Sequence, residues 1–211
     1  MELEEMANAV THGVGLIAAI AALPALIVLA SNRGDVWTVV GAGVFGVSLI
    51  AAYAASTIYH ALRPGPEKER WLRLDYAAIY ILIAGTYTPF TVGVLRGTWG
   101  SSLLVIVWTL AIVGIFAKLR VGPRFNGLST AAYLLMGWLA LVAINPLLRH
   151  MGWVGLAWLL AGGVAYTVGV VFYACDNRIR FGHCLWHLFA IVGSLCHVIA
   201  VVGYGIGAPR G

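Results

Sequence analysis

Residues 36–62 read VWTVVGAGVFGVSLIAAYAASTIYHAL, and this stretch decides the fold. It contains no Asp, Glu, Lys or Arg. At 1.5 Å per helical residue it is long enough to cross the hydrocarbon core of a bilayer, which is about 30 Å thick. The stretch therefore predicts a transmembrane helix. Its last turns carry Ser56 and His60, polar side chains that are rare inside such helices.

The rest of the chain has the same character. Hydrophobic residues make up 61% and charged residues only 10%, with a mean hydropathy of +0.91, whereas a soluble domain carries about a quarter charged residues. Six further apolar blocks are predicted to span the membrane: Val10–Leu29, Trp71–Leu95, Trp99–Leu119, Leu128–Leu148, Met151–Cys175 and His183–Tyr204. We expect one all-α domain over residues 1–211, a polytopic bundle of seven transmembrane helices. The fifth and sixth blocks are parted by little more than Arg149-His150, so six spans is the alternative.

The distribution of basic residues predicts the orientation, because cytoplasmic loops are enriched in Lys and Arg. An amino terminus in the cytoplasm places the C-terminus outside. Nine basic residues are then inside: Arg63, Lys68, Arg70, Arg73, Lys118, Arg120, Arg124, Arg178 and Arg180. The other four are outside: Arg33, Arg96, Arg149 and Arg210. Since these residues occur singly or in small groups between apolar blocks, the net charge of +5 does not indicate nucleic-acid binding.

Polar residues inside the predicted spans converge on one membrane level. His60 ends the second span, Asp75 begins the third, and His183 and His187 begin the seventh, all on the inner side. His183 and His187 are one turn apart, so both imidazoles project from one helix face. Three histidines are a typical catalytic zinc set with a fourth position open to water. In this hypothesis Asp75 is the base, and Ser56 donates to a developing oxyanion.

Each of these residues also has a simpler interpretation. Histidines at a helix end can face interfacial water, Asp75 can pair with Arg73 or cap its helix, and Ser56 can bond back to the carbonyl of Ala52. His150 is expected at the surface. His197, ten residues after His187, is expected to be a hydrogen-bonded helix contact. Cys175, Cys184 and Cys196 are expected to be apolar filler, although Cys184 has ligand spacing to His187.

Glu5, Asn8 and His12 share one face of the first helix, at the same inner level. They are expected either to support the metal ligands through hydrogen bonds from behind or to line a substrate entrance. A polar helix start that only anchors the helix is the alternative.

Five motifs together resemble a known family. They are Glu5-x-x-Asn8-x-x-x-His12, Ser56-Thr-Ile-Tyr-His60, Leu74-Asp75-Tyr76, Gly85-Thr-Tyr-Thr-Pro89 and His183-x-x-x-His187. Their order and spacing over the whole chain resemble bacterial hemolysin III proteins of the progestin and adipoQ receptor (PAQR) family, which includes the adiponectin receptors. The resemblance implies seven helices in the bacterial inner (cytoplasmic) membrane. It also implies zinc on His60, His183 and His187, with Asp75 and Ser56 beside it.

The resemblance also implies a function, because the family is grouped with alkaline ceramidases. A zinc-dependent hydrolase of lipid amide or ester bonds is the first hypothesis, with a membrane lipid as substrate or ligand. A receptor-like sensor with structural zinc is the second, and a pore-forming, proton-handling or cytolytic protein is the third. Receptor members have a sizeable region before their first helix, whereas only about nine residues precede the first span here. No large soluble partner is therefore expected.

Overall fold

The computed structural model describes residues 3–124 and 126–206, and within these ranges every regular element is helical. Arg210 lies outside the described residues. The elements are α1 (Leu3–Arg33), α2 (Val36–Ala61), α3 (Pro66–Val92), α4 (Thr98–Val121), α5 (Asn126–Trp138), the 3₁₀ turn η1 (Leu139–Ala143), α6 (Ile144–Ala174), α7 (Gly182–Ala200) and the π turn η2 (Val201–Gly205).

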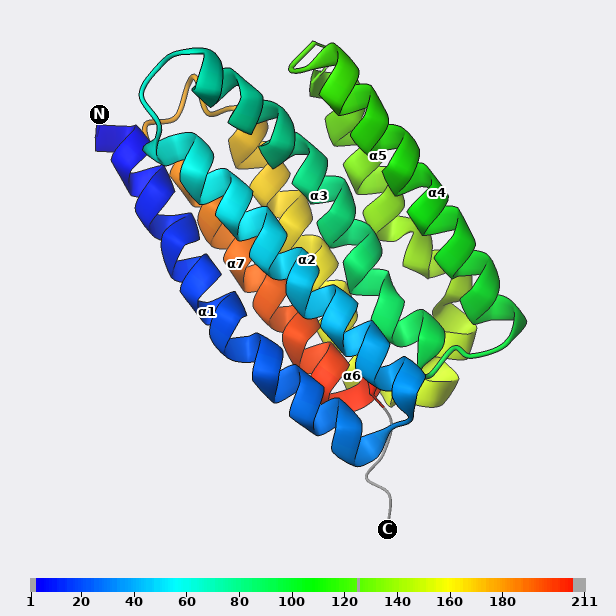
Figure 1. Ribbon diagram of the computed structural model, residues 1–211. Coiled ribbons are helices and arrows are strands. Elements are labelled where there is room, and N and C mark those ends of the chain that lie inside the picture. Colours follow the sequence, from blue (N-terminus) through cyan, green and yellow to red (C-terminus); the bar gives the residue numbers. More distant parts are fainter. Residues whose placement is uncertain (1–2, 125, 207–211) are drawn as a thin grey trace.

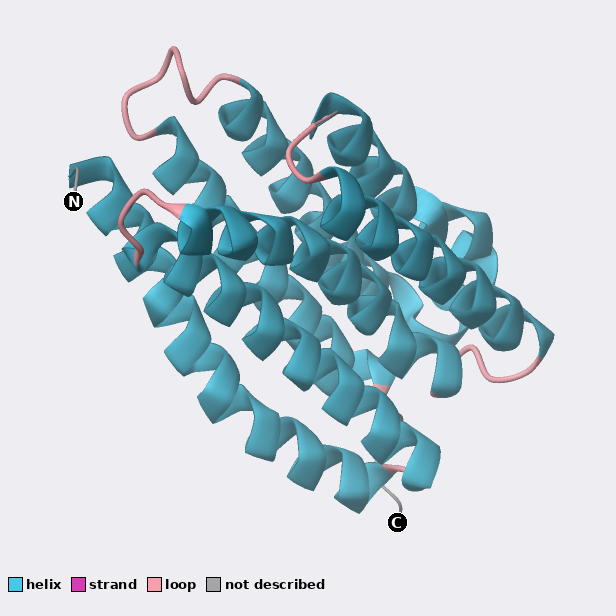
Figure 2. Ribbon diagram, turned by 45° about the horizontal axis from the view of Figure 1, so that its top comes forward, coloured by secondary structure: helices cyan, strands magenta, loops and turns pink. Residues whose placement is uncertain are grey.

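The helices form an elongated bundle with short connections at its two ends (Figures 1 and 2). Helix α2 packs against both α1 and α3, and α4 packs against α3. Helix α7 packs against α6 and returns beside α1, so the two ends of the chain are joined through the α1–α7 contact. This closure brings the start of α7 next to the end of α2, although more than a hundred residues separate them in sequence.

Five segments are long and apolar enough to cross a membrane: Leu3–Arg33, Val36–Ala61, Thr98–Val121, Asn126–Ala174 and Gly182–Gly205. Helix α3 is not among them, because its first half is rich in charge, from Glu67 to Asp75. The long segment Asn126–Ala174 is interrupted at Gly152, where φ is +65° and the chain turns back along the bundle (Figure 1). The break comes three residues after the charged Arg149, because only glycine adopts this backbone conformation readily.

The outer surface of the bundle is largely apolar, which indicates a lipid rather than an aqueous surrounding. On α1, Val14 is 60% exposed and Ile17 70%, and on α5 Leu135 is 74% exposed. A water-soluble protein rarely presents such contiguous apolar faces, whereas hydrocarbon requires them. Trp37, Trp99 and Trp153 are also exposed, as expected of aromatic anchors at a membrane interface. The chain is a multi-pass membrane protein.

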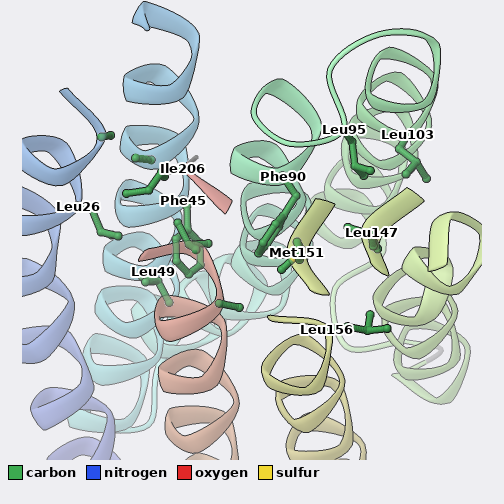
Figure 3. Packing of buried hydrophobic residues seen from close by; sticks show 14 of the residues in the cluster. Leu26, Phe45, Leu49, Phe90, Leu95, Leu103, Leu147, Met151, Leu156 and Ile206 are labelled. Atoms are coloured by element: carbon green, nitrogen blue, oxygen red, sulfur yellow. The ribbon is translucent and has the colours of Figure 1, made fainter. Parts of the chain in front are cut away.

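Apolar packing is concentrated at one end of the bundle. Phe45 of α2 is fully buried and lies among Leu26 of α1, Phe90 of α3 and Ile206 after η2 (Figure 3). Close dispersion contacts of this kind hold helices together in lipid, where burial of apolar area gives little driving force. The opposite end carries the start of α1 and the α2–α3, α4–α5 and α6–α7 connections (Figure 1). That end holds the basic loops and the polar residues.

Candidate metal centre

Three histidines meet at the polar end of the bundle. His60 lies in the last turn of α2, and His183 and His187 lie in the first two turns of α7. Their ligand-capable nitrogens all lie within 4.8 Å of one another. The ring centroids are 5.1 Å apart for His60 and His183, and 4.9 Å for His60 and His187. His60 and His187 are almost completely buried, so the arrangement is a compact triangle of imidazoles.

In each of the three rings, Nδ1 lies within hydrogen-bond distance of an oxygen atom. Nδ1 of His60 lies 3.1 Å from Oε2 of Glu5, and Nδ1 of His183 lies 3.1 Å from Oδ2 of Asp176. Nδ1 of His187 lies 3.2 Å from the carbonyl oxygen of Asn8. Carboxylate and carbonyl oxygens only accept hydrogen bonds, so each Nδ1 carries the proton and donates. The lone pair of each imidazole is then on Nε2, and buried Nε2 of His60 has no hydrogen-bond partner among the described residues.

Helix α1 supports this arrangement without joining the triangle. Glu5 is itself held by Lys68, whose Nζ donates to Oε2 at 2.7 Å. Asn8 acts through its backbone carbonyl, and the hydroxyl oxygen of Thr11 lies 3.3 Å from Nδ1 of His187. His12 stacks on the ring of His187. The expected face of Glu5, Asn8 and His12 therefore meets the histidines directly.

Sequence reasoning missed three of these supports. Lys68 is second in the charged run Glu67-Lys68-Glu69-Arg70 and counts only as one of the inner basic residues, and nothing in the sequence singles out Thr11. Asp176 lies seven residues before His183 in the α6–α7 connection. A carboxylate just ahead of the His183-x-x-x-His187 pair was the available signal, since metal-bound histidines commonly donate to a carboxylate.

Asp75 and Ser56 line a cavity of about 150 Å³ that starts beside the triangle and is also lined by His12, His183 and His187. The Ser56 hydroxyl faces the Asp75 carboxyl. It forms no hydrogen bond of ordinary geometry with any described group, so it does not bond back to Ala52. Arg73 donates instead to the carbonyl of Leu119, and no ion pair joins it to Asp75 within the described ranges.

The remaining candidates lie elsewhere. His150 is exposed and bonds to the carbonyl of Pro146. His197 is buried and bonds to the carbonyl of Gly193, one turn earlier in α7, as expected for a hydrogen-bonded helix contact. All three cysteines are free thiols. Cys184 is not part of the histidine triangle.

The triangle could hold a metal ion. Three imidazoles that hydrogen-bond through Nδ1 and leave Nε2 for an ion are the donor set that suits zinc and related transition metals. The carboxylates and carbonyl behind them fix the tautomer and the ring plane, which is the usual support for metal-bound histidine. Buried polar atoms normally have a partner, and an ion in the triangle would supply one for the buried Nε2 of His60.

Known proteins match nearly the whole chain. A family model described as haemolysin-III related matches residues 2–198. The chain is 44% identical over 206 residues to the hemolysin-3 homolog of Bacillus subtilis (strain 168), covering 98% of this chain and 96% of that protein. It is 45% identical over 201 residues to hemolysin-3 of Bacillus cereus, covering 95% and 91%. It is 27% identical over 211 residues to the human monocyte to macrophage differentiation factor, covering 98% and 86%.

Proposed function

Because the chain belongs to the haemolysin-III-related family of membrane proteins, we propose that it is a zinc-dependent hydrolase of amide or ester bonds in membrane lipids. The observation that carries the proposal is the position of the histidine triangle. His183 and His187 line a cavity whose wall also holds a carboxylate, Asp75, and a hydroxyl without an ordinary hydrogen bond, Ser56.

His60, His183 and His187 would hold the zinc through Nε2. When bound, zinc lowers the pKa of a coordinated water towards about 7 and polarises a carbonyl oxygen. The residues of the chain do the rest. Asp75 accepts the proton of the attacking water and returns it to the leaving nitrogen or oxygen as the acyl bond breaks. Ser56 donates its hydroxyl proton in a hydrogen bond to the developing oxyanion.

The cavity walls suit a lipid substrate. Away from the triangle they are largely apolar, with Ile79, Leu82, Ile83 and Leu134 among the lining residues. An acyl chain placed there keeps its carbonyl carbon at the polar end. We propose a membrane lipid as the partner, and neither nucleic acid nor a large soluble protein.

The proposed topology is one domain with seven membrane crossings in the bacterial inner membrane. In it α3 crosses despite its charged start, and the break at Gly152 separates the fifth crossing from the sixth. The α2–α3, α4–α5 and α6–α7 connections, whose sequences contain basic residues, lie at the same end as the start of α1 (Figure 1). The positive-inside rule then puts that end and the triangle on the cytoplasmic side.

Metal content and hydrolysis measured on the same detergent-purified samples test the proposal. The variants are His187→Ala and, as a matched control, His150→Ala, which removes an exposed histidine. We expect about one zinc per chain in the wild type and the control, none in His187→Ala, and release of fatty acid from an N-acyl or ester lipid only by the first two. Folded, zinc-loaded wild type that cleaves neither lipid class would overturn the hydrolase.

A second candidate is a sensor in which zinc only joins helices. The hydrogen bonds behind the triangle tie α1 to α2 and α7, so an ion held there would couple three helices. A thermal midpoint that collapses on chelation, in protein without hydrolytic activity, would favour this candidate.

A further inference from the structure

A second polar cluster lies deeper in the same cavity, and neither the metal ligands nor the proposed reaction uses it. It consists of Tyr53, Tyr166, Ser194 and His197, and we call it the deep polar cluster. Tyr53, Tyr166 and His197 line the cavity. The walls around them are mainly apolar, so polar atoms at this depth need a reason.

The hydrogen bonds inside the cluster leave one donor free. Tyr53 donates its hydroxyl proton to Oγ of Ser194 at 2.7 Å, and the Tyr166 hydroxyl lies 2.8 Å from the same Oγ. Ser194 has one proton of its own. Tyr53 donates to Oγ rather than to the carbonyl oxygen of Ala190, because Oγ is at 2.7 Å and the carbonyl oxygen at 3.4 Å, so Ser194 donates its own proton to Tyr166. The hydroxyl proton of Tyr166 then has no partner within the cluster and is free to donate.

His197 supplies the matching acceptor. Its Nδ1 lies 2.7 Å from the carbonyl oxygen of Gly193 and must carry the proton, so the lone pair is on Nε2. No described group bonds to that Nε2, although His197 is only 8% exposed. A methyl group on Gly162 would collide with this ring, so Gly162 leaves the space that the imidazole fills. The ring centroids of Tyr166 and His197 are 5.6 Å apart.

A free donor beside a free acceptor matches one chemical group particularly well, an aliphatic hydroxyl. Its oxygen accepts from Tyr166, and its proton is donated to Nε2 of His197. We propose that the deep polar cluster binds a hydroxyl group on the acyl chain of the ligand, so that the substrate class is a hydroxylated lipid. This inference rests on the proposed function only in taking a lipid as the occupant of the cavity.

The position of the hydroxyl follows from helix geometry. His197 is ten residues after His187 in α7, which is about 15 Å along the helix axis. An extended chain advances about 1.2 Å per bond, so about twelve bonds separate a carbonyl at the triangle from the hydroxyl. A second cavity of about 50 Å³ shares His197, Tyr87 and Trp138 with the first and continues beyond it among leucines. The rest of the acyl chain has room there.

Binding of uncleavable fatty acids tests the inference. The probes are 12-hydroxyoctadecanoate, 5-hydroxyoctadecanoate and octadecanoate, each measured by displacement of a fluorescent fatty acid from purified protein. We expect wild type to prefer 12-hydroxyoctadecanoate over the other two by about tenfold, since one well-formed pair of hydrogen bonds is at stake. The preference should fall to about one in Tyr166→Phe and in His197→Phe, which keep a ring in place. Tyr80→Phe removes a hydroxyl outside the cavity and should keep the preference.

The octadecanoate affinity shows in each variant whether the cavity is still folded. Equal binding of all three probes to wild type would overturn the inference, because the cluster would then bind only water. A preference for hydroxyl at either position equally would overturn it as well. Lipid cleavage measured on the same folded, zinc-loaded wild type separates the two proposals. A preference that survives in protein that cleaves no lipid removes the hydrolase alone, and cleavage without any preference removes the deep site alone.

Discussion

The imidazoles of His12 and His187 stack face to face, with centroids 3.5 Å apart and only 10° between the ring planes. His12 is buried, and neither of its ring nitrogens has a hydrogen-bond partner among the described residues. It is not one of the three clustered ligands. Its contribution to the centre is therefore the flat face of the ring, which fixes the plane of His187.

This stacking predicts different outcomes for two substitutions at one position. His12→Ala removes the face that holds His187 and should weaken zinc binding about tenfold, the lower range for loss of a supporting residue. His12→Phe keeps the face and should lose little. Competition for zinc against a fluorescent chelator measures both. Equal losses in the two variants would show that a ring nitrogen of His12 matters instead.

The carboxylate behind His60 gives a second prediction. Glu5→Ala leaves Nδ1 of His60 without its acceptor and Lys68 without its closest partner. Zinc affinity should fall between about 10- and 100-fold. Glu67→Ala removes an exposed carboxylate at the same end, which pairs with Arg70 alone in the part of the chain that the structure describes, and should leave the affinity unchanged. The same chelator titration applies, and a loss in both variants would point to net charge rather than to the hydrogen bond.

Asp75→Asn should separate chemistry from metal binding. The amide keeps the shape of the side chain but cannot take a proton, so lipid hydrolysis should fall by about 10² to 10⁴. Zinc content should stay near that of the wild type, because Asp75 is not one of the clustered ligands. Metal analysis and fatty-acid release on one sample give both values. Loss of zinc together with activity would make Asp75 a ligand.

A fourth prediction concerns pH at the opposite end of the bundle. Asp35 caps α2 and forms two hydrogen bonds with Arg96, at 2.6 and 2.9 Å. The Arg96 guanidinium holds the pKa of Asp35 well below its usual range. A depressed pKa stabilises the fold above the unfolded-state pKa of about 4, and this contribution is lost as the pH falls through the lower folded-state value.

Asp35→Asn keeps a capping side chain but removes the charge. Its thermal midpoint should lie a few degrees below that of the wild type at neutral pH, and the difference should shrink as the pH drops below about 4. Scans of metal-free protein in detergent avoid any pH-dependent release of a bound ion. A difference that persists unchanged in acid would exclude the carboxylate charge as its cause.

Close packing of α2 on α3 gives a fifth prediction. A methyl group on Gly41 would lie 2.9 Å from the Cα of Pro89 and 2.8 Å from a methyl of Val92. Because Pro89 Cα is a backbone atom that no side-chain rotation can move aside, the helices must move apart, and Gly41→Ala should cost about 1–3 kcal/mol. Gly13→Ala meets Thr57 at an ordinary 3.7 Å and should be neutral or stabilising. Thermal unfolding in detergent compares the two variants. Equal unfolding midpoints would mean that α2 and α3 can accommodate a methyl group at Gly41 without moving apart.

Sequence alone placed the polar end of the bundle well, since His60, Asp75, His183 and His187 are costly in a membrane and stand out from their apolar neighbours. It could not show that Asn8 acts through its carbonyl, because a backbone group leaves no trace in the residue type. The contact of His183 with Asp176 follows a turn in which Phe181 has φ +59°. No local pattern predicts that conformation for phenylalanine.

Span boundaries differ from the apolar blocks for a related reason. Helix α1 begins at Leu3 rather than at Val10, because helical hydrogen bonding continues past the apolar stretch. The Arg149-His150 pair was expected to mark the break before the sixth block, and the break lies at Gly152, where the backbone can turn. The polar pair therefore indicated the region of the break, and the conformational freedom of glycine determined that it lies at Gly152.

Helix α1 provides none of the three clustered nitrogens, yet its first turns hold two of the three rings in place. On its other side the same stretch presents Val10 and Val14, each 60% exposed, to the surrounding lipid. Movement of the start of α1 away from the bundle would therefore free two of the three rings to rotate while each ligand residue stayed on its own helix.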